Sequence, residues 1–122
     1  RLIMEHLLLD PFRKLLGCEV EEIRDGYARV RGVVRDEFLN IHGVAHGGFI
    51  MALADFAFAI SANTDAKRVA VKISMNFYSP AYKGDTLVAE AEKVRGKRLG
   101  FYRLKVFKNG ELIAEGSAIA YG

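Results

Sequence analysis

The sequence has only one cysteine, Cys18, among its 122 residues. A lone thiol cannot build a disulfide framework, a CxxC redox site or a cysteine metal cluster, and this usage is typical of a reducing compartment. No basic, apolar and small-residue leader opens the sequence, so we expect a cytoplasmic protein. The longest apolar run is too short to span a bilayer and contains Asp55, so we expect no membrane partner.

The chain also lacks a linker, a low-complexity tract and an internal repeat. Its length and its hydrophobic fraction of 51% predict one folded domain over residues 1–122. That fraction is slightly high for a small chain, which indicates apolar surface buried outside the monomer's own core. Oligomerisation is one way to bury such surface.

Negative charge is scarce in the second half of the chain. Residues 64–122 carry 11 basic and 6 acidic side chains, for a formal charge of +5, whereas residues 1–63 carry 7 and 9, for −2. A basic half is able to hold an anionic partner such as a phosphorylated cofactor or a nucleic acid. It is also the pattern of an ordinary solvated sheet face, so charge alone leaves both interpretations open.

The apolar spacing predicts two helical segments and six strands. Residues 2–16 have helical spacing with Pro11 inside, which favours a kink or two short helices before a stop at Gly17. Residues 46–62 have no turn residue after Gly48 and are predicted to form one long buried helix. Alternating residues predict strands over 18–24, 27–35, 68–79, 86–94, 98–108 and 111–121.

The last four strands have short connections, including the two-residue hairpin signal Asn109-Gly110. Parallel connections need about a dozen residues, so we expect these four strands to form an antiparallel meander. One sheet of about six strands packed on one long helix follows, which is an α+β fold. Since the long helix is apolar all round, we expect the sheet to cover one side and a second subunit the rest. In strand 68–79 the alternation places one apolar set on one face: Val69, Val71, Ile73, Met75 and Phe77.

Two glycines, Gly47 and Gly48, open the long helix, where their helix propensity is poor. They leave backbone N–H groups open at the positive end of the helix dipole, which suits an anion or a developing oxyanion. Close packing against a neighbouring strand explains the glycines equally well.

Asp55 is the one charged residue between Phe49 and Ala62. Its apolar flanks predict burial, and no Lys or Arg lies three or four residues away. An unpaired buried carboxylate is costly, should have a raised pKa and is typical of functional sites. A rise of about 1.5 Å per residue separates Asp55 from Gly47 by roughly 12 Å, too far for one carbonyl to touch both. If both groups serve one reaction, they come from two antiparallel helices, which predicts a homodimer with two shared sites.

Asn40 and His46 lie just before this helix. The Asn40 amide can donate to a carbonyl or orient a water, and Asn is also common in plain turns. His42 and His46 form an HxxxH spacing, but two imidazoles without a following acid fall short of a ligand set, so we expect no metal. A serine hydrolase is not favoured because the sequence has no GxSxG.

The spacing Asn40-(x5)-His46-Gly47-Gly48-(x6)-Asp55 resembles the motif of the hotdog-fold thioesterases, in particular the PaaI-like group of the 4-hydroxybenzoyl-CoA thioesterase superfamily. Three further stretches resemble the rest of such a domain, so the resemblance covers roughly residues 12–122: LADFAFAISAN, MNFYSPAYKGDTLVAEAEKVRGKRLGFYRLKVF and GELIAEGSA. It implies an antiparallel sheet wrapped around a helix, subunits paired through both, and often a homotetramer built as a dimer of dimers.

The resemblance also implies hydrolysis of an acyl-CoA thioester, with aryl-CoA thioesters among the expected substrates and no cofactor besides the CoA of the substrate. By this resemblance the Gly47 N–H polarises the thioester carbonyl, Asn40 assists there or holds the water, and His46 shapes the turn and the pocket. Asp55 of the partner subunit is the general base or the nucleophile, and Gly48 contributes to substrate binding.

The chain departs from the family pattern at one position. Some relatives carry a Ser or Thr on the third strand that helps to hold the attacking water, and the corresponding position here is Ala70. Either Asp55 and Asn40 hold the water alone, or Ser74 or Thr64 substitutes, or the activity is weaker.

CoA phosphates suit the basic second half of the chain, where Lys97 and Arg98 in the RGKR turn are the candidates to bind them. Two other activities fit the same fold: a non-catalytic module that binds or senses acyl-CoA, and a hydratase or dehydratase. No helix-turn-helix is visible, so we expect no nucleic-acid partner. The position of Asp55 after the HGG triplet fits a thioesterase better than a hydratase, and the acyl specificity stays open.

Overall fold

The computed structural model describes residues 9–122, so residues 2–8 of the helical segment predicted over 2–16 lie outside the described residues. Helix α2 (Pro11–Leu16) begins at Pro11. The backbone N–H that proline lacks is not needed at the first position of a helix. The expected kink is therefore a helix start instead. Asp10 caps the helix by accepting from the backbone N–H of Phe12 at 3.0 Å. Gly17 ends it with a left-handed φ of 71°, as the sequence predicts.

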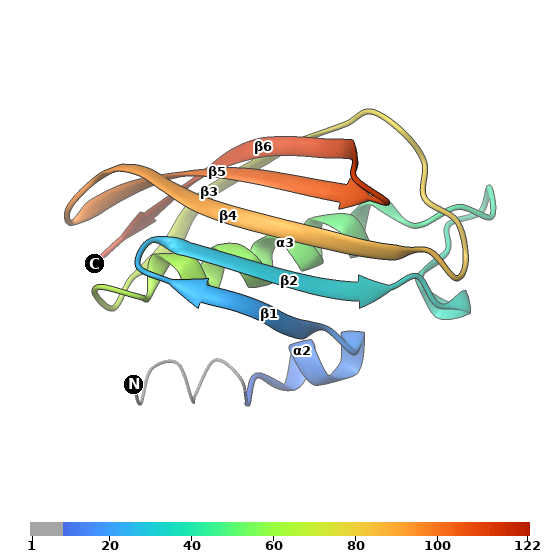
Figure 1. Cartoon of the computed structure of the whole chain (residues 1–122), viewed down its shortest axis with the longest axis horizontal. Helices are drawn as coiled ribbons and strands as arrows, with labels where there is room; N and C mark the ends of the chain where they lie inside the picture. Colours follow the sequence, from blue (N-terminus) through green and yellow to red (C-terminus); the bar gives the residue numbers. More distant parts are fainter. Residues whose placement is uncertain (1–8) are drawn as a thin grey trace.

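The rest of the chain forms one antiparallel sheet of six strands and one helix of 16 residues (Figure 1). The α+β class and the order of the elements agree with the expectation from the sequence. The bounds are β1 (Glu19–Arg24), β2 (Tyr27–Val33), the 3₁₀ helix η1 (Asp36–Phe38), α3 (Gly47–Ala62), β3 (Val69–Phe77), β4 (Thr86–Gly96), β5 (Leu99–Lys108) and β6 (Glu111–Tyr121).

The predicted meander of the last four strands is wrong in one respect. Strands β4, β5 and β6 are consecutive neighbours, but β3 pairs with β6, and the sheet order is β1-β2-β4-β5-β6-β3. Short connections exclude parallel neighbours, but they do not require strands that follow each other in sequence to be adjacent. The connection over residues 78–85 is long enough to cross the end of the sheet from β3 to β4 (Figure 1). Strand β3 is therefore an edge of the sheet.

Strand β3 also breaks the simple alternation predicted for it. A register shift between Ala70 and Lys72 adds one residue to this strand, so that Val69 pairs with Tyr121 while Ile73 pairs with Ala118. Tyr121 and Ala118 are three residues apart on β6 and face opposite sides. Val69 and Ile73 therefore lie on opposite faces of the sheet, and the apolar set is not one-sided.

Helix α3 lies against the inner face of the curved sheet (Figure 1). Its large side chains Phe49, Leu53, Phe56 and Ile60 recur at helical spacing and are buried in the core. The strands oppose them with small side chains, which let the helix approach closely: Ala28, Ala89, Ala91, Ala114, Ala118 and Ala120 are all buried. Within residues 9–122, no helix is long and apolar enough to cross a membrane.

Arg68 fixes the C-terminal end of α3. Its guanidinium is buried, donates to the backbone oxygens of Ala62 and Lys97 at 3.0 Å each, and pairs with Asp65. These bonds satisfy a carbonyl that the helix end leaves without an intrahelical partner. Part of the positive charge in the second half of the chain is therefore structural.

One face of α3, which we call the open stripe, is not covered by the sheet. Its members are half-buried or exposed and recur at helical spacing: Gly47, Gly48, Met51, Ala52, Asp55 and Ala59. The prediction that Asp55 is buried is thus wrong for the single chain, where this residue is exposed. Its apolar sequence neighbours do not bury it, because they point to other sides of the helix.

Candidate functional site

The loop before α3 brings Asn40 and Gly47 to one cavity. The backbone N–H of His46 donates to the Phe38 oxygen at 2.7 Å, and that of Ala45 donates to the Ala81 oxygen at 2.8 Å. These bonds tie both sides of the loop to neighbouring segments. The resulting cavity, which we call the Gly47 cavity, has a volume of about 300 Å³ and is lined by Asn40, Ala45, Gly47, Ile50, Phe77, Tyr78, Ser79 and Pro80.

The two glycines have different roles in this structure. His46 is the N-cap of α3, and its Nδ1 accepts from the Gly48 N–H at 2.7 Å. A Cβ added at Gly48 would lie 2.9 Å from that Nδ1, so this glycine gives the imidazole room. A Cβ at Gly47 would meet only the Phe77 ring, at an ordinary 3.6 Å. Close packing therefore explains Gly48 and does not explain Gly47.

The Gly47 N–H is available to a ligand. Among the hydrogen bonds of residues 9–122, none uses this donor. It lies in the first turn of α3, where the backbone carries the positive end of the helix dipole. The start of α3 can therefore donate one hydrogen bond to an anion or an oxyanion in the Gly47 cavity.

Asn40 combines the two roles that its sequence position left open. Its side-chain oxygen accepts from the backbone N–H groups of His42 and Val44, at 2.8 and 3.3 Å, which closes the turn. Because both partners are donors, the atom that faces them must be Oδ1. The Nδ2 amide group has no acceptor in the described part of the chain and belongs to a residue that lines the Gly47 cavity. Asn40 is thus a turn residue whose N–H₂ remains free to donate.

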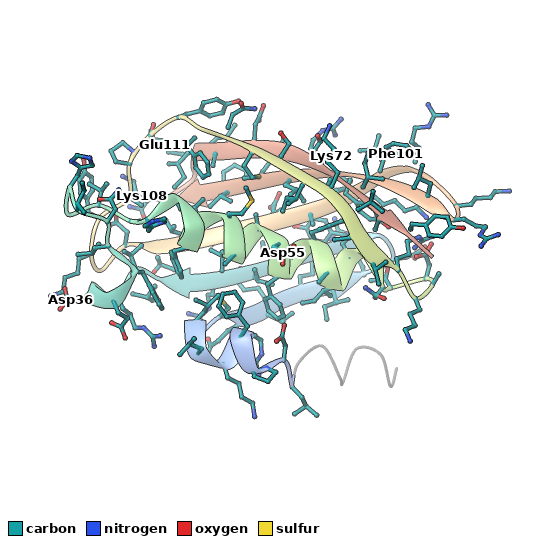
Figure 2. All side chains as sticks on the ribbon, turned by 180° about the vertical axis from the view of Figure 1, so that it is seen from behind. Asp36, Asp55, Lys72, Phe101, Lys108 and Glu111 are labelled. Atoms are coloured by element: carbon teal, nitrogen blue, oxygen red, sulfur yellow. The ribbon has the colours of Figure 1, made fainter. Side chains whose placement is uncertain are left out.

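Asp55 points away from the sheet, from the middle of the open stripe (Figure 2). Its carboxylate has no hydrogen bond or ion pair among the described residues. Desolvation by its apolar surroundings, and then the negative charge of Asp10, raise the pKa of Asp55 above its ordinary value. The carboxylate is therefore accessible in the single chain and still more basic than a fully solvated aspartate.

A single chain does not bring Asp55 to the Gly47 cavity. Helix α3 is continuous from Gly47 to Ala62, so the eight-residue separation of Gly47 and Asp55 corresponds to roughly 12 Å along its axis. The structure unites Asn40, His46, Gly47 and Gly48 at the helix start and leaves Asp55 two turns away. Within the described chain, the Gly47 cavity and the Asp55 carboxylate are therefore separate features.

The residues considered as substitutes for a water-holding Ser or Thr do not reach the site. Thr64 Oγ1 accepts from the Gly26 N–H at 2.8 Å and donates to the Ser61 oxygen at 2.9 Å, so it joins the β1–β2 turn to the end of α3. Ser74 pairs with Ser117 on the face of the sheet opposite to α3. Ala70 brings no hydroxyl. Two alternatives are left: either Asp55 and Asn40 hold the water alone, or the activity is weaker.

Lys97 and Arg98 lie at the far end of the molecule from Gly47. Arg68 ties the Lys97 backbone to the C-terminal end of α3, about 22 Å along the helix axis from Gly47. Arg98 donates to the Tyr121 hydroxyl at 3.0 Å. Within one chain, these two cations and the Gly47 N–H cannot contact the same part of a ligand.

Sequence reasoning missed the far wall of the Gly47 cavity, which Phe77 and Tyr78 form where β3 ends. Both side chains are exposed, and the signal for them was an apolar pair near the end of the strand predicted over 68–79. A larger hollow, of about 540 Å³, is an open groove on the outer face of β4, β5 and β6. It lies on the other side of the sheet from α3, so its size does not make it part of this site. Within residues 9–122, no three His, Cys, Asp or Glu side chains gather as a metal site would need.

Comparison with known proteins connects this geometry with a family. The family model described as "Thioesterase superfamily" matches residues 42–114. The acyl-coenzyme A thioesterase PaaI of Escherichia coli (strain K12) is 35% identical over 99 residues, which cover 80% of this chain and 71% of that protein.

Two solved structures extend the similarity to the whole fold. The PaaI protein of E. coli, from the phenylacetic acid degradation operon, has a TM-score of 0.91 and 30% identity, covering 96% of this chain and 88% of that chain. A mutant of the phenylacetic acid degradation protein PaaI from Thermus thermophilus has a TM-score of 0.90 and 39% identity, covering 92% of this chain and 98% of that chain.

Proposed function

The chain belongs to the thioesterase superfamily, as a PaaI-like hotdog-fold enzyme that hydrolyses acyl-CoA, and we propose that each of its active sites is built from half-sites of two subunits. One subunit supplies the start of α3 and the other supplies Asp55. The proposal rests on one observation. The open Gly47 N–H and the unpaired Asp55 carboxylate lie on the same uncovered stripe, but too far apart for one thioester carbonyl to contact both.

The start of α3 acts on the thioester carbonyl. The Gly47 N–H donates to the carbonyl oxygen, and Asn40 Nδ2 is the second donor, since its Oδ1 is already held by the turn. Negative charge grows on that oxygen when the carbonyl is attacked, so donors aimed at it stabilise the transition state more than the ground state. His46 acts through the helix start, because its cap orients the first turn of α3.

The partner's Asp55 supplies the carboxylate. Either it takes a proton from water, whose oxygen then attacks the carbonyl carbon, or it attacks that carbon directly and the acyl-enzyme is hydrolysed afterwards. In both routes the C–S bond breaks, the thiolate of CoA leaves and takes up a proton, and the free acid is formed. The raised pKa of Asp55 favours both roles, because a more basic carboxylate is a better proton acceptor and nucleophile.

The open stripe and the β3 edge support a two-fold dimer. Two antiparallel α3 helices that place each Asp55 beside the other Gly47 have their axis at the midpoint, Met51. Strand β3 adds an unpaired edge with exposed Val69 and Val71, at 64% and 60%, which a monomer would leave open to unwanted pairing. A partner subunit would cover both the open stripe and the β3 edge. A dimer of dimers is part of the same proposal, and the mass of the assembly in solution tests it.

A thiol-release assay with acyl-CoA tests the proposed function. Single-turnover hydrolysis in ¹⁸O-water then tests the direct route. Label in the Asp55 carboxylate means direct attack, because water then opens the mixed anhydride at the Asp55 carboxyl carbon. An intact acyl-CoA that stays bound without thiol release over hours would contradict the catalytic assignment.

We expect Asp10→Asn to move the acid limb of the kcat/KM profile to lower pH. The ionised Asp55 is the active form, so activity falls as the pH falls through its raised pKa. Removing the negative charge of Asp10 lowers that pKa, since this charge is one of the two causes of its elevation. Asn is also a good N-cap, so α2 keeps its start. The pH–rate profile is the measurement, with Asp25→Asn in the β1–β2 turn as the control, and an unmoved limb would contradict the link.

The CoA phosphates are placed near Lys97 and Arg98 of the partner subunit. In the antiparallel pair, the end of the partner's α3 extends about 10 Å beyond Gly47, because Ala62 is seven residues past Asp55. The cations that are too far away within one chain are thus close to the shared site from the other. Lys97 and Arg98 of one subunit therefore bind the phosphates of the CoA whose thioester lies at Gly47 of the other subunit.

Charge reversal at Lys97 and Arg98 should raise KM for acyl-CoA roughly ten-fold and leave kcat nearly unchanged, because exposed ion pairs contribute up to about 1 kcal/mol each. Steady-state kinetics at low and high salt is the measurement, and the effect should shrink with salt. The control substrate is an acyl-N-acetylcysteamine thioester, which has no phosphates and should show an unchanged KM. An unchanged KM for acyl-CoA would remove both residues from the site.

A further inference from the structure

A buried arginine joins the end of α3 to the β4–β5 turn that carries Lys97 and Arg98. This turn, the end of α3 and the C-terminus lie at the same end of the molecule, opposite to the start of α3 (Figure 1). The Arg68 side chain is only 3% exposed, although this residue lies in the loop between α3 and β3. Its Nε donates to the Lys97 oxygen and its Nη1 donates to the Ala62 oxygen, at 3.0 Å each. Because a guanidinium presents five N–H donors in a fixed geometry, one side chain holds both segments.

Arg68 is itself fixed to α3 by neighbouring side chains. Asn63, the C-cap of α3, accepts from the Arg68 backbone N–H at 2.9 Å through Oδ1. The Nδ2 of Asn63 donates to the Ala59 oxygen at 2.7 Å, which anchors the cap to the last turn of the helix. Asp65 pairs with the guanidinium and compensates a charge that burial alone would make costly. The position of Arg68 relative to α3 is therefore set through both its backbone and its side chain.

The backbone of the β4–β5 turn is held from two more directions. Lys93, on β4 just before the turn, donates to the Asp65 carboxylate at 2.9 Å, and the Gly122 N–H donates to the Arg98 oxygen at 2.9 Å. Lys97, in contrast, is exposed, and its ammonium has no hydrogen bond or ion pair within residues 9–122. The turn thus combines a fixed backbone with a cation that is left for a ligand.

The β4–β5 turn and Asp55 belong to one connected unit of the fold. Helix α3 is continuous from Asp55 to Ala62, a distance of about 10 Å, and Arg68 continues this connection from the helix end to the turn. In the proposed dimer, Asp55 and the phosphate-binding cations of one site come from the same subunit. Arg68 therefore lies between the two parts that this subunit contributes.

We propose that Arg68 is a positioning residue for CoA recognition: it holds Lys97 and Arg98 where they meet the phosphates of the CoA whose thioester lies beside Asp55. This inference rests on the proposed function, which places the phosphates at these two cations. A turn that is already ordered loses less conformational freedom when it binds its ligand, so Arg68 lowers KM for substrates that carry phosphates. Arg68 touches neither the thioester nor the attacking group, so it has no direct part in the chemical step.

Arg68→Lys tests this role. Lysine keeps the positive charge beside Asp65, but its single ammonium cannot reproduce the planar fork that bonds Ala62 and Lys97 together. We expect KM for acyl-CoA to rise about five-fold, as when one long side chain must be ordered on binding, with kcat nearly unchanged. KM for an acyl-N-acetylcysteamine thioester, which has no phosphates, should not change. Arg103→Lys is the matched control, because Arg103 is exposed on β5 and belongs to none of these contacts, and KM for both substrates should stay at the wild-type value.

A second background separates positioning from a general loss of structure. The Lys97→Ala/Arg98→Ala enzyme keeps the Lys97 oxygen that Arg68 binds and lacks the cations that Arg68 is proposed to position. In this background Arg68→Lys should add no further rise in KM for acyl-CoA. An equal rise in both backgrounds, or a rise for the substrate without phosphates, would show a merely structural role and overturn the inference. Lys93→Met, which removes only the contact with Asp65, replaces Arg68→Lys in the same comparison if that variant does not fold.

The outcomes distinguish this inference from the proposed function. If the wild type releases no thiol from acyl-CoA, the proposed function fails and the role of Arg68 fails with it. If thiol is released but charge reversal at Lys97 and Arg98 leaves KM unchanged, the phosphates lie elsewhere and Arg68 positions nothing for them. If both of these tests succeed and Arg68→Lys leaves KM for acyl-CoA at the wild-type value, only the role of Arg68 is overturned.

Discussion

Asp55→Asn is expected to lower kcat by about 100- to 10,000-fold, the usual contribution of a positioned acid–base group, while the protein stays folded. Asn keeps the shape of the side chain and loses both its negative charge and its ability to accept a proton. KM should change little, because the carboxylate acts on the attacking atom and not on the bulk of CoA. Thiol-release kinetics with saturating acyl-CoA is the measurement.

The stability of this variant distinguishes a catalytic carboxylate from a structural one. In the described chain Asp55 has no hydrogen bond or ion pair, and its surroundings raise its pKa. A folded-state pKa above the unfolded value means that the ionised group opposes folding at neutral pH. Asp55→Asn should therefore leave Tm unchanged or raise it, as measured by thermal unfolding at pH 7.

Asp65→Asn is the matched control, with the opposite expectation. Asp65 pairs with the buried Arg68 and with Lys93, and hydrogen bonding by Arg68 lowers the pKa of Asp65 to about 2. A folded-state pKa below the unfolded value contributes stability at neutral pH, which is lost as the pH falls toward 2. This variant should lower Tm and keep kcat. An Asp55→Asn enzyme with near wild-type kcat would remove Asp55 from the mechanism.

The parts of the fold that the sequence predicts well are those fixed by neighbouring residues. The hairpin at Asn109-Gly110 and the stop at Gly17 follow from the left-handed backbone that these positions adopt. The long helix follows from 16 residues without a proline, begun by a capping residue at His46. In each case the cause lies within a few residues of the effect.

The parts that failed depend on contacts between distant segments. The pattern of β3 indicates a strand but not its neighbour, and pairing with β6 instead of β4 needs the path of residues 78–85 over the sheet end. The residues that flank Asp55 in sequence are apolar, but they lie on other sides of α3. The exposure of Asp55 depends instead on which side of α3 the sheet covers.

The candidate site shows the same division. The separation of Gly47 and Asp55 along α3 could be predicted from their spacing, because the rise per residue alone sets the distance along a continuous helix. The sequence could not show that Asn40 Nδ2 is free to donate, because this depends on the turn whose N–H groups occupy Oδ1. The distance of Lys97 from Gly47 also required the fold, since it depends on how segments far apart in the chain pack together.

Asn40→Asp is expected to lower kcat by at least about 100-fold, the usual cost of losing one oxyanion donor. The aspartate keeps an oxygen for the N–H groups of His42 and Val44, so the turn is preserved. It replaces the free amide donor by a negatively charged acceptor beside the developing oxyanion. Asn40→Ala loses the turn bonds as well and should have a lower Tm, whereas Asn40→Asp should not. Equal kcat in Asn40→Asp and the wild type would make Asn40 a turn residue only.

The two impaired variants together test whether the site is shared. When Asp55→Asn and Asn40→Asp chains are unfolded, mixed and refolded, a mixed pair has one site with Asn40 and Gly47 from the first chain and Asp55 from the second. That site is intact, and the other carries both defects. Random pairing makes half of the dimers mixed, so the mixture should recover about a quarter of wild-type activity from two nearly inactive parents. If Asn40, Gly47 and Asp55 acted within one chain, every mixed pair would have two defective sites and no activity would return. Recovery therefore requires the antiparallel pairing of α3 that the distance between Gly47 and Asp55 predicts.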